Sequence, residues 1–135
     1  MSENILDCIN KDGEVVRFGP LQPFLRTIEP AFQQRASEIS FETFISEDRN
    51  EIPKTTAWYK KDGHKFKLVV AEGFHPLITS SRLKIMAGMS IALNQGTTES
   101  KIHLRFGSDV IDVNMQIRLS GSYETIILSP DWNIK

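Results

Sequence analysis

Residues 101–128 read KIHLRFGSDVIDVNMQIRLSGSYETIIL, and this stretch decides the fold. Apolar and polar residues mostly alternate along three runs, as they do on strands that bury one face. The links between the runs are short and contain glycine, and sequential strands joined by short links pair antiparallel. We therefore predict an antiparallel meander with strands at Lys101 to Phe106, Asp109 to Leu119 and Tyr123 to Leu128.

Two upstream segments have the pattern of hairpins. Strand-forming residues flank the turn sequences at 10–13 and 61–63, and both turns end in Asp-Gly, which supplies the positive φ that tight hairpins require. The predicted strands are Ile5 to Ile9 with Glu14 to Phe18, and Thr55 to Lys60 with His64 to Ala71. Phe41 to Ser46 is a further predicted strand, and the charged residues 47–53 are predicted to form a loop.

Between the hairpins the apolar spacing is helical. From Leu21 to Ile39 apolar residues recur every three or four positions, which is typical of an amphipathic helix. Pro23 suits a first helical turn, whereas Pro30 has to kink or restart the helix. We expect this segment to cover the apolar face of the sheet, with Phe24, Leu25, Ile28 and Phe32 against Phe66, Leu68, Leu104 and Ile117.

Residues 81–94 fit two structures. Apolar residues occupy every second position from Leu83 to Leu93, which predicts a strand with one buried face. The segment also carries a helical apolar stripe, which Ser80 or Ser81 would cap and Gly96 would close. We favour the strand and keep the helix as the alternative.

Together these segments predict one α+β domain, residues 1–135, in which strands dominate. The sheet is expected to be an antiparallel meander or a partly closed barrel, with the N-terminal helical segment packed on one face. A chain of 135 residues with 40% apolar and 24% charged residues is long and apolar enough to bury a core of its own.

The sequence does not predict a membrane-bound or secreted protein. No apolar run reaches the roughly 18 residues that a membrane span needs, and residues 1–7 are acidic where a secretory signal would be basic. We therefore expect a cytoplasmic location. The single cysteine, Cys8, follows Asp7, whose charge opposes a thiolate, and we interpret Cys8 as a small buried apolar residue.

Charge is distributed unevenly along the chain, although the formal net charge is only −1. Residues 1–53 carry five basic and ten acidic side chains, whereas residues 54–105 carry nine basic and three acidic ones. In the basic segment, cations alternate with apolar residues, so strands that share one core would turn these cations to the same outer surface. The set is Lys65, Lys67, Arg82, Lys84, Lys101 and Arg105, together with His103.

A cationic sheet surface attracts polyanions, because neutralised phosphates release their counterions. Trp58 and Tyr59 lie next to these cations in the sequence, and aromatic rings stack on unpaired bases. The sequence thus predicts a non-enzymatic protein that binds an anionic polymer, above all nucleic acid, through these nine residues.

Two alternatives are open. Lysines on a solvent-facing sheet also keep strands soluble and discourage edge pairing, without any partner. The acidic first third can instead dock on the basic surface of a neighbouring copy, as in a self-assembling capsid, matrix or tail component.

No local signature of catalysis is present in the sequence. It has no glycine-rich phosphate loop, no Gly-x-Ser-x-Gly elbow and no His-Glu-x-x-His. His64, His75 and His103 are far apart, so a zinc site would require long-range convergence. His75 is the best single candidate for a base, although an ordinary loop histidine explains it better. We expect no enzymatic activity, metal or cofactor.

Overall fold

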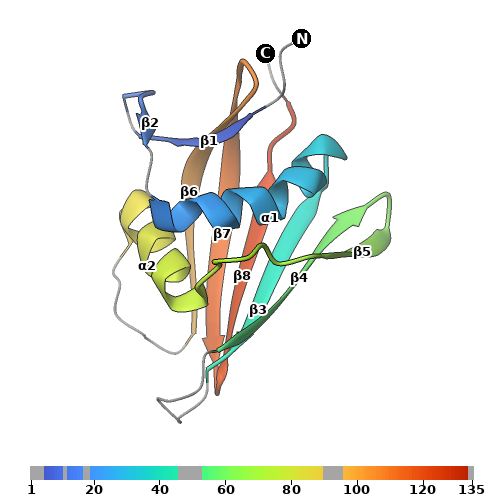
Figure 1. Ribbon diagram of the computed structural model, residues 1–135, viewed down its shortest axis with the longest axis vertical. Helices are drawn as coiled ribbons and strands as arrows, with labels where there is room; N and C mark the ends of the chain where they lie inside the picture. The colour runs from blue at the N-terminus through green and yellow to red at the C-terminus, as the bar shows by residue number, and fades with distance from the viewer. Residues whose placement is uncertain (1–4, 11, 17–18, 46–52, 90–95, 134–135) are drawn as a thin grey trace.

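The computed structural model describes residues 5–10, 12–16, 19–45, 53–89 and 96–133. These residues form one open sheet of eight strands, antiparallel throughout, in the order β2-β1-β6-β7-β8-β3-β4-β5 (Figure 1). The predicted strand-dominated α+β fold is confirmed. The strands are β1 (Leu6–Ile9), β2 (Val15–Val16), β3 (Glu38–Phe44), β4 (Lys54–Lys61), β5 (His64–Leu68), β6 (Gly96–Phe106), β7 (Asp109–Ser120) and β8 (Tyr123–Pro130).

Helices cover one face of this sheet, which we refer to as the inner face; the opposite face is the outer face (Figure 1). They are the short 3-10 helix η1 (Gly19–Leu21) and the α-helices α1 (Gln22–Gln33) and α2 (Pro76–Met86). No helix within the described ranges is long and apolar enough to cross a membrane.

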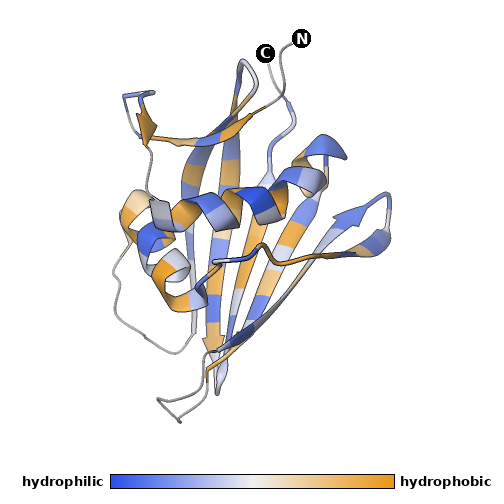
Figure 2. Ribbon diagram, in the orientation of Figure 1, coloured by the Kyte–Doolittle hydropathy of each residue, from blue (hydrophilic) through white to orange (hydrophobic). Residues whose placement is uncertain are grey.

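The predicted meander of the last third is confirmed. Strands β6, β7 and β8 are neighbours in the sheet as well as in the sequence. Ile102 pairs with Val113, and Met115 pairs with Leu128, so apolar side chains of adjacent strands lie together on the inner face. The alternation appears as hydrophobic and hydrophilic bands along the strands in Figure 2.

Both predicted hairpins are present. Asp62 and Gly63 join β4 to β5 with φ values of 52° and 78°, which are the left-handed conformations that a tight hairpin turn requires. In the first hairpin, Cys8 of β1 pairs with Val16 of β2. Lys11 and residues 17–18 of that hairpin, and residues 46–52 of the predicted strand end and charged loop, lie outside the described residues.

Helix α1 is shorter than the predicted helical segment. It continues past Pro30 and ends at Gln33, where the left-handed Arg35 and the hydrogen bond from the N–H of Ala36 to the carbonyl of Ala31 cap the helix. The prediction that the helix reaches Ile39 is wrong. Ile39 belongs to β3, where it pairs with Leu128 of β8, since strand pairing on both sides satisfies the backbone of this segment.

Residues 81–86 belong to helix α2, so the strand prediction for 81–94 is wrong over this part, and residues 90–95 lie outside the described residues. Leu83 is buried and Ile85 is exposed, although both belong to the alternating apolar set. Successive positions on a helix are turned by about 100°, so residues two apart point in nearly opposite directions. In this segment, the alternation of apolar residues therefore did not indicate a strand with one buried face.

Local chemistry defines both ends of α2. The His75 ring caps the N-terminus by accepting a hydrogen bond from the backbone N–H of Ile78 at 3.4 Å, and Pro76 takes the first helical position. Gly88, just after the C-terminus, adopts a φ of 71°, which is a left-handed conformation that glycine adopts without steric cost. The caps are therefore His75 and Gly88 rather than the serines and Gly96 considered above.

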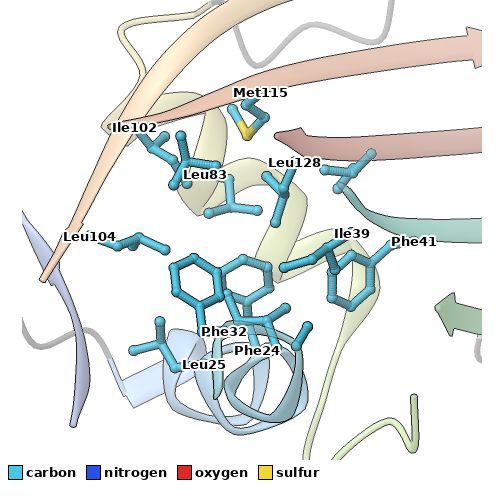
Figure 3. Close-up of a cluster of buried hydrophobic side chains, with 14 of the residues drawn as sticks. Phe24, Leu25, Phe32, Ile39, Phe41, Leu83, Ile102, Leu104, Met115 and Leu128 are labelled. Carbon is cyan, nitrogen blue, oxygen red and sulfur yellow. The ribbon is translucent and has the colours of Figure 1, made fainter. Parts of the chain in front are cut away.

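The core lies between α1 and the inner face (Figure 3). Phe24 and Phe32 of α1 are fully buried, and the ring centroid of Phe24 lies 5.6 Å from that of Phe41 on β3. The buried hydroxyl of Thr27 accepts a hydrogen bond from the backbone N–H of Ala71 at 2.9 Å. Helix α1 thereby also fixes the segment that leads from β5 to α2.

Most of the expected packing partners of α1 are present. Leu68, Leu104 and Ile117 belong to the same buried core as the helix residues. The prediction is wrong for Phe66, which is 44% exposed. The β4–β5 hairpin projects past α1 (Figure 1), and Phe66 stacks on Tyr59 of its own hairpin instead.

Substituting Phe32→Ala tests the central role of this core. We expect a loss of about 3–5 kcal/mol in the free energy of unfolding, because a large cavity replaces a fully buried ring. Urea denaturation followed by circular dichroism measures it. The matched control is Phe66→Ala, which should cost less than about 1 kcal/mol because the ring is partly exposed. Equal losses in the two variants would contradict this account of the core.

Candidate nucleic-acid interface

The outer face at the β5 edge of the sheet brings three of the nine predicted site residues together. Trp58 of β4 pairs with Lys67 of β5, and Lys60 pairs with Lys65. Directly paired residues of an antiparallel sheet point to the same face with side chains in contact range. Trp58, Lys65 and Lys67 therefore share one surface.

Lys65 and Trp58 are in direct contact. The ammonium nitrogen of Lys65 lies 4.1 Å from the centroid of the Trp58 ring, which is a cation–π interaction. Both residues line a groove of about 580 Å³ on this surface, together with Lys67. The remaining residues of the groove are Glu42, Thr56 and Ala57. An aromatic face and two cations are thus presented side by side in a concave site.

Two further lysines of β4, Lys54 and Lys60, extend this surface. They lie an even number of positions from Trp58 along the strand, so they point to the same face. We define the hairpin patch as Lys54, Trp58, Lys60, Lys65 and Lys67. Two glutamates of β3 adjoin it: Glu38 pairs with Lys60 at 3.1 Å, and Glu42 lies in the groove. Four lysines against two carboxylates leave the patch cationic at neutral pH.

Tyr59, which the sequence placed beside Trp58 in the site, does not share this surface. Its ring stacks on Phe66 at 5.1 Å between centroids, and it packs against the core on the inner face. Adjacent residues of a strand point to opposite faces, so only one of the two aromatic residues can belong to the outer face.

The cations of β6 lie on the outer face but far from the hairpin patch. Strands β7, β8, β3 and β4 separate β6 from β5, which is roughly 24 Å along the sheet at the usual strand spacing. His103 Nδ1 lies 2.7 Å from Asp112, and Arg105 lies 3.1 Å from Asp7. Lys101 is exposed beside Asn114. Two of these three predicted residues therefore face a carboxylate of their own chain.

The two cations of α2 do not join the outer face either, because α2 packs on the inner side of the sheet. Arg82 is exposed on the helix, whereas Lys84 is buried. The Lys84 ammonium lies 3.4 Å from the carboxylate of Glu124 on β8, and the two side chains are only 7% and 3% exposed. Lys84 has the role of a structural charge partner, since a buried ammonium needs a counter-charge.

The predicted continuous surface of seven cations is therefore corrected to the hairpin patch. Sequence reasoning missed Lys54, Lys60 and Glu42, which border or line the groove. The sequence of β4 could have indicated Lys54 and Lys60, because alternate residues of a strand share a face and both lie an even number of positions from Trp58. The place of Glu42 could be known only from the pairing of β3 with β4, because Glu42 enters the groove opposite Thr56.

Cys8 is buried on the inner face of β1, in agreement with its interpretation as an apolar core residue. Desolvation by burial and, to a smaller extent, the neighbouring Asp7 carboxylate together raise the pKa of its thiol to about 12. Within the described ranges, no three His, Cys, Asp or Glu side chains converge as metal ligands would.

Comparison with models of known protein families and with curated protein sequences finds no match to this chain. The chemistry of the site is therefore inferred from its own geometry. That geometry consists of one half-buried indole ring, two lysines in the groove and two more lysines at its border.

Removing one partner of the buried ion pair tests its structural role. We expect Lys84→Met to lower the free energy of unfolding by about 3–5 kcal/mol, because the Glu124 carboxylate is left buried without a counter-charge. The double variant Lys84→Met with Glu124→Leu should recover most of the loss in urea denaturation. A double variant as unstable as the single one would argue against a paired structural role.

The raised pKa of Cys8 gives a pH dependence of stability. The thiol titrates at about 12 in the folded chain and near 9.0 otherwise, so the unfolded chain loses its proton first and stability falls as the pH rises above 9. The stability difference between the wild type and Cys8→Ala should change by about 1 kcal/mol from pH 9 to 10, to the disadvantage of the wild type. Urea titrations at both pH values measure it, and a constant difference would refute the shift.

Proposed function

We propose that this protein is a non-enzymatic binding protein that holds single-stranded nucleic acid on the hairpin patch. The observation that carries the proposal is the contact between Lys65 and the Trp58 ring inside a groove that also contains Lys67. Single-strand binding combines cations for the phosphates with an aromatic face for a base. The hairpin patch places both within one groove.

The lysines of two adjacent strands bind the phosphates. Lys65 and Lys67 are exposed neighbours on the outer face of β5, and Lys54 and Lys60 flank them on β4. Flexible ammonium groups bind phosphate as point charges without selecting a base sequence. The proposed binding is therefore electrostatic, dependent on salt and tolerant of sequence.

Trp58 supplies the stacking surface. Lys65 covers the ring in the free protein, and the same ammonium can move to a phosphate when a base takes its place on the ring. A duplex keeps its bases paired and stacked, so it offers no free base face to Trp58. The proposed ligand is thus an extended single strand rather than a duplex.

Assembly through complementary acidic and basic patches stays a prediction. Acidic residues of the first third already pair with basic residues of their own chain, Asp7 with Arg105 and Glu38 with Lys60. Ion pairs of this kind neutralise charge that docking between copies would use. Light scattering of the protein in solution measures whether copies associate.

Binding of a labelled oligothymidylate, followed by fluorescence anisotropy, tests the proposal. Affinity should fall from about 50 to 200 mM salt, and each lysine lost should reduce the logarithmic salt slope by about 0.7. Lys65→Ser with Lys67→Ser should therefore lower the slope by about 1.4. Trp58→Ala should cost about 1–3 kcal/mol of binding free energy through lost stacking.

Two further variants sharpen this test. Lys101→Ser removes the same charge from the outer face at β6 and should leave affinity nearly unchanged. Glu42→Gln removes a carboxylate from the groove and should strengthen binding roughly two- to fivefold, because one repulsion of about 0.5–1 kcal/mol disappears. Binding that ignores salt, or that Lys101→Ser weakens as much as Lys65→Ser does, would refute the proposal.

A further inference from the structure

A second concave site lies at the C-terminal end of α1, away from the hairpin patch. It is a small pocket of about 150 Å³ enclosed by three segments that are distant in the sequence: the end of α1, the β6–β7 turn and the residues after β8. The nucleic-acid proposal does not use this pocket. The lining residues that matter for its chemistry are Phe32, Arg35, Phe106, Asp109 and Trp132.

Arg35 is held at the pocket by the turn that caps α1. Its φ of 51° is the left-handed conformation with which many helices end, and the backbone N–H groups of Arg35 and Ala36 donate to the carbonyls of Phe32 and Ala31, each at 3.0 Å. The guanidinium carbon lies 5.5 Å from the centroid of the Trp132 ring, and the Trp132 indole N–H donates to the carbonyl of Ala36 at 2.7 Å. The helix cap and the contact with Trp132 thus keep this cation beside the pocket.

Asp109 contributes the opposite charge to the same pocket. It begins β7, where it pairs with Phe106 across the β6–β7 turn. Among the ion pairs of the described ranges, none joins Arg35 to Asp109. One cavity is therefore lined by a cation and an anion that do not neutralise each other directly. The C-terminal end of α1 also carries the negative end of the helix dipole, which favours a positive ligand group there.

The floor of the pocket is formed by packed aromatic rings. Phe32 is fully buried and packs edge-on against two rings, with centroids 5.4 Å from Trp132 and 5.8 Å from Phe106. Phe106 and Trp132 are only partly buried and provide the aromatic surface that a ligand meets. Such a floor suits methylene groups, and aromatic faces also attract ammonium groups. A volume of 150 Å³ equals about five water molecules at roughly 30 Å³ each, which limits the ligand to a few heavy atoms.

We propose that this pocket binds a small zwitterion, namely a free amino acid with one carboxylate, one ammonium group and a short aliphatic chain. The guanidinium of Arg35 binds the carboxylate, for which its planar fork of donors is suited. Asp109 and the C-terminal end of α1 bind the ammonium group. The methylene groups lie on the aromatic floor.

Heteronuclear NMR titration of the full chain tests this proposal with glycine, β-alanine and γ-aminobutyrate. The indole N–H signal of Trp132 reports binding, because this group adjoins the pocket; the variant Trp132→Phe distinguishes it from that of Trp58. We expect saturable shifts in which at least one zwitterion binds about tenfold more tightly than acetate or methylammonium, each of which carries only half of the charge pattern.

Two variants test the contributions of the cation and the anion separately. Arg35→Gly should keep the fold, since glycine favours the left-handed conformation, and should abolish zwitterion binding. Asp109→Asn should lower the affinity for zwitterions until they bind no more tightly than acetate. Lys101→Ser, remote from the pocket, should change nothing.

Three outcomes would overturn the proposal. They are no shift at about 100 mM of any zwitterion, acetate binding as tightly as the zwitterions, and zwitterion binding that survives in folded Arg35→Gly. The oligothymidylate assay reports on the hairpin patch and the zwitterion titration reports on the pocket. Each proposal can therefore fail while the other stands.

Discussion

The burial of α1 against the inner face of the sheet is the interaction on which the rest of the structure depends. A strand that alternates apolar and polar residues cannot bury its apolar face alone, and Phe24 and Phe32 supply the covering surface. Burying a large apolar side chain contributes about 1.5–3 kcal/mol. Thr27 adds a specific restraint through its hydrogen bond to Ala71, which ties the end of the β4–β5 hairpin to the helix. The hairpin patch is therefore held in place from the opposite side of the sheet.

The fold pairs charges from oppositely charged parts of the chain. Ion pairs join the acidic first third and the acidic C-terminal part to the basic middle, at Asp7 with Arg105, Glu38 with Lys60 and Lys84 with Glu124. On the β4–β5 hairpin, several lysines gather with fewer acids beside them. A charge count along the sequence consequently overstates the cationic surface, because pairing across the sheet is decided by strand order.

The two concave sites share a principle of construction. In the groove, Trp58 and the lysines stand on a two-strand hairpin, and the carboxylate of Glu42 comes from the neighbouring strand β3. In the pocket, Arg35 and Asp109 come from segments more than seventy positions apart in the sequence. Each site combines opposite charges with an aromatic surface. The groove is open and suits an extended polymer, whereas the pocket is small and suits a compact molecule.

The sequence by itself determined the elements whose signals are local. Hairpin turns with Asp-Gly at 12–13 and 62–63, the alternation in 101–128 and the helical spacing around Phe24 to Phe32 all depend on neighbouring residues, and the structure contains each of them. The sequence also predicted that Lys65 and Lys67 share one face, because alternate residues of a strand point to the same side. The strand pairing in the structure places Trp58 beside Lys67 on that face. Only the tertiary structure decided the strand order, and with it which cations meet. Helix α2 has polar residues on its buried side, where Lys84 pairs with Glu124, so no apolar periodicity could distinguish it from a strand. Strand β6 lies beside β1 and β7 rather than beside β5 because long-range pairing follows burial of the whole core, to which every segment contributes.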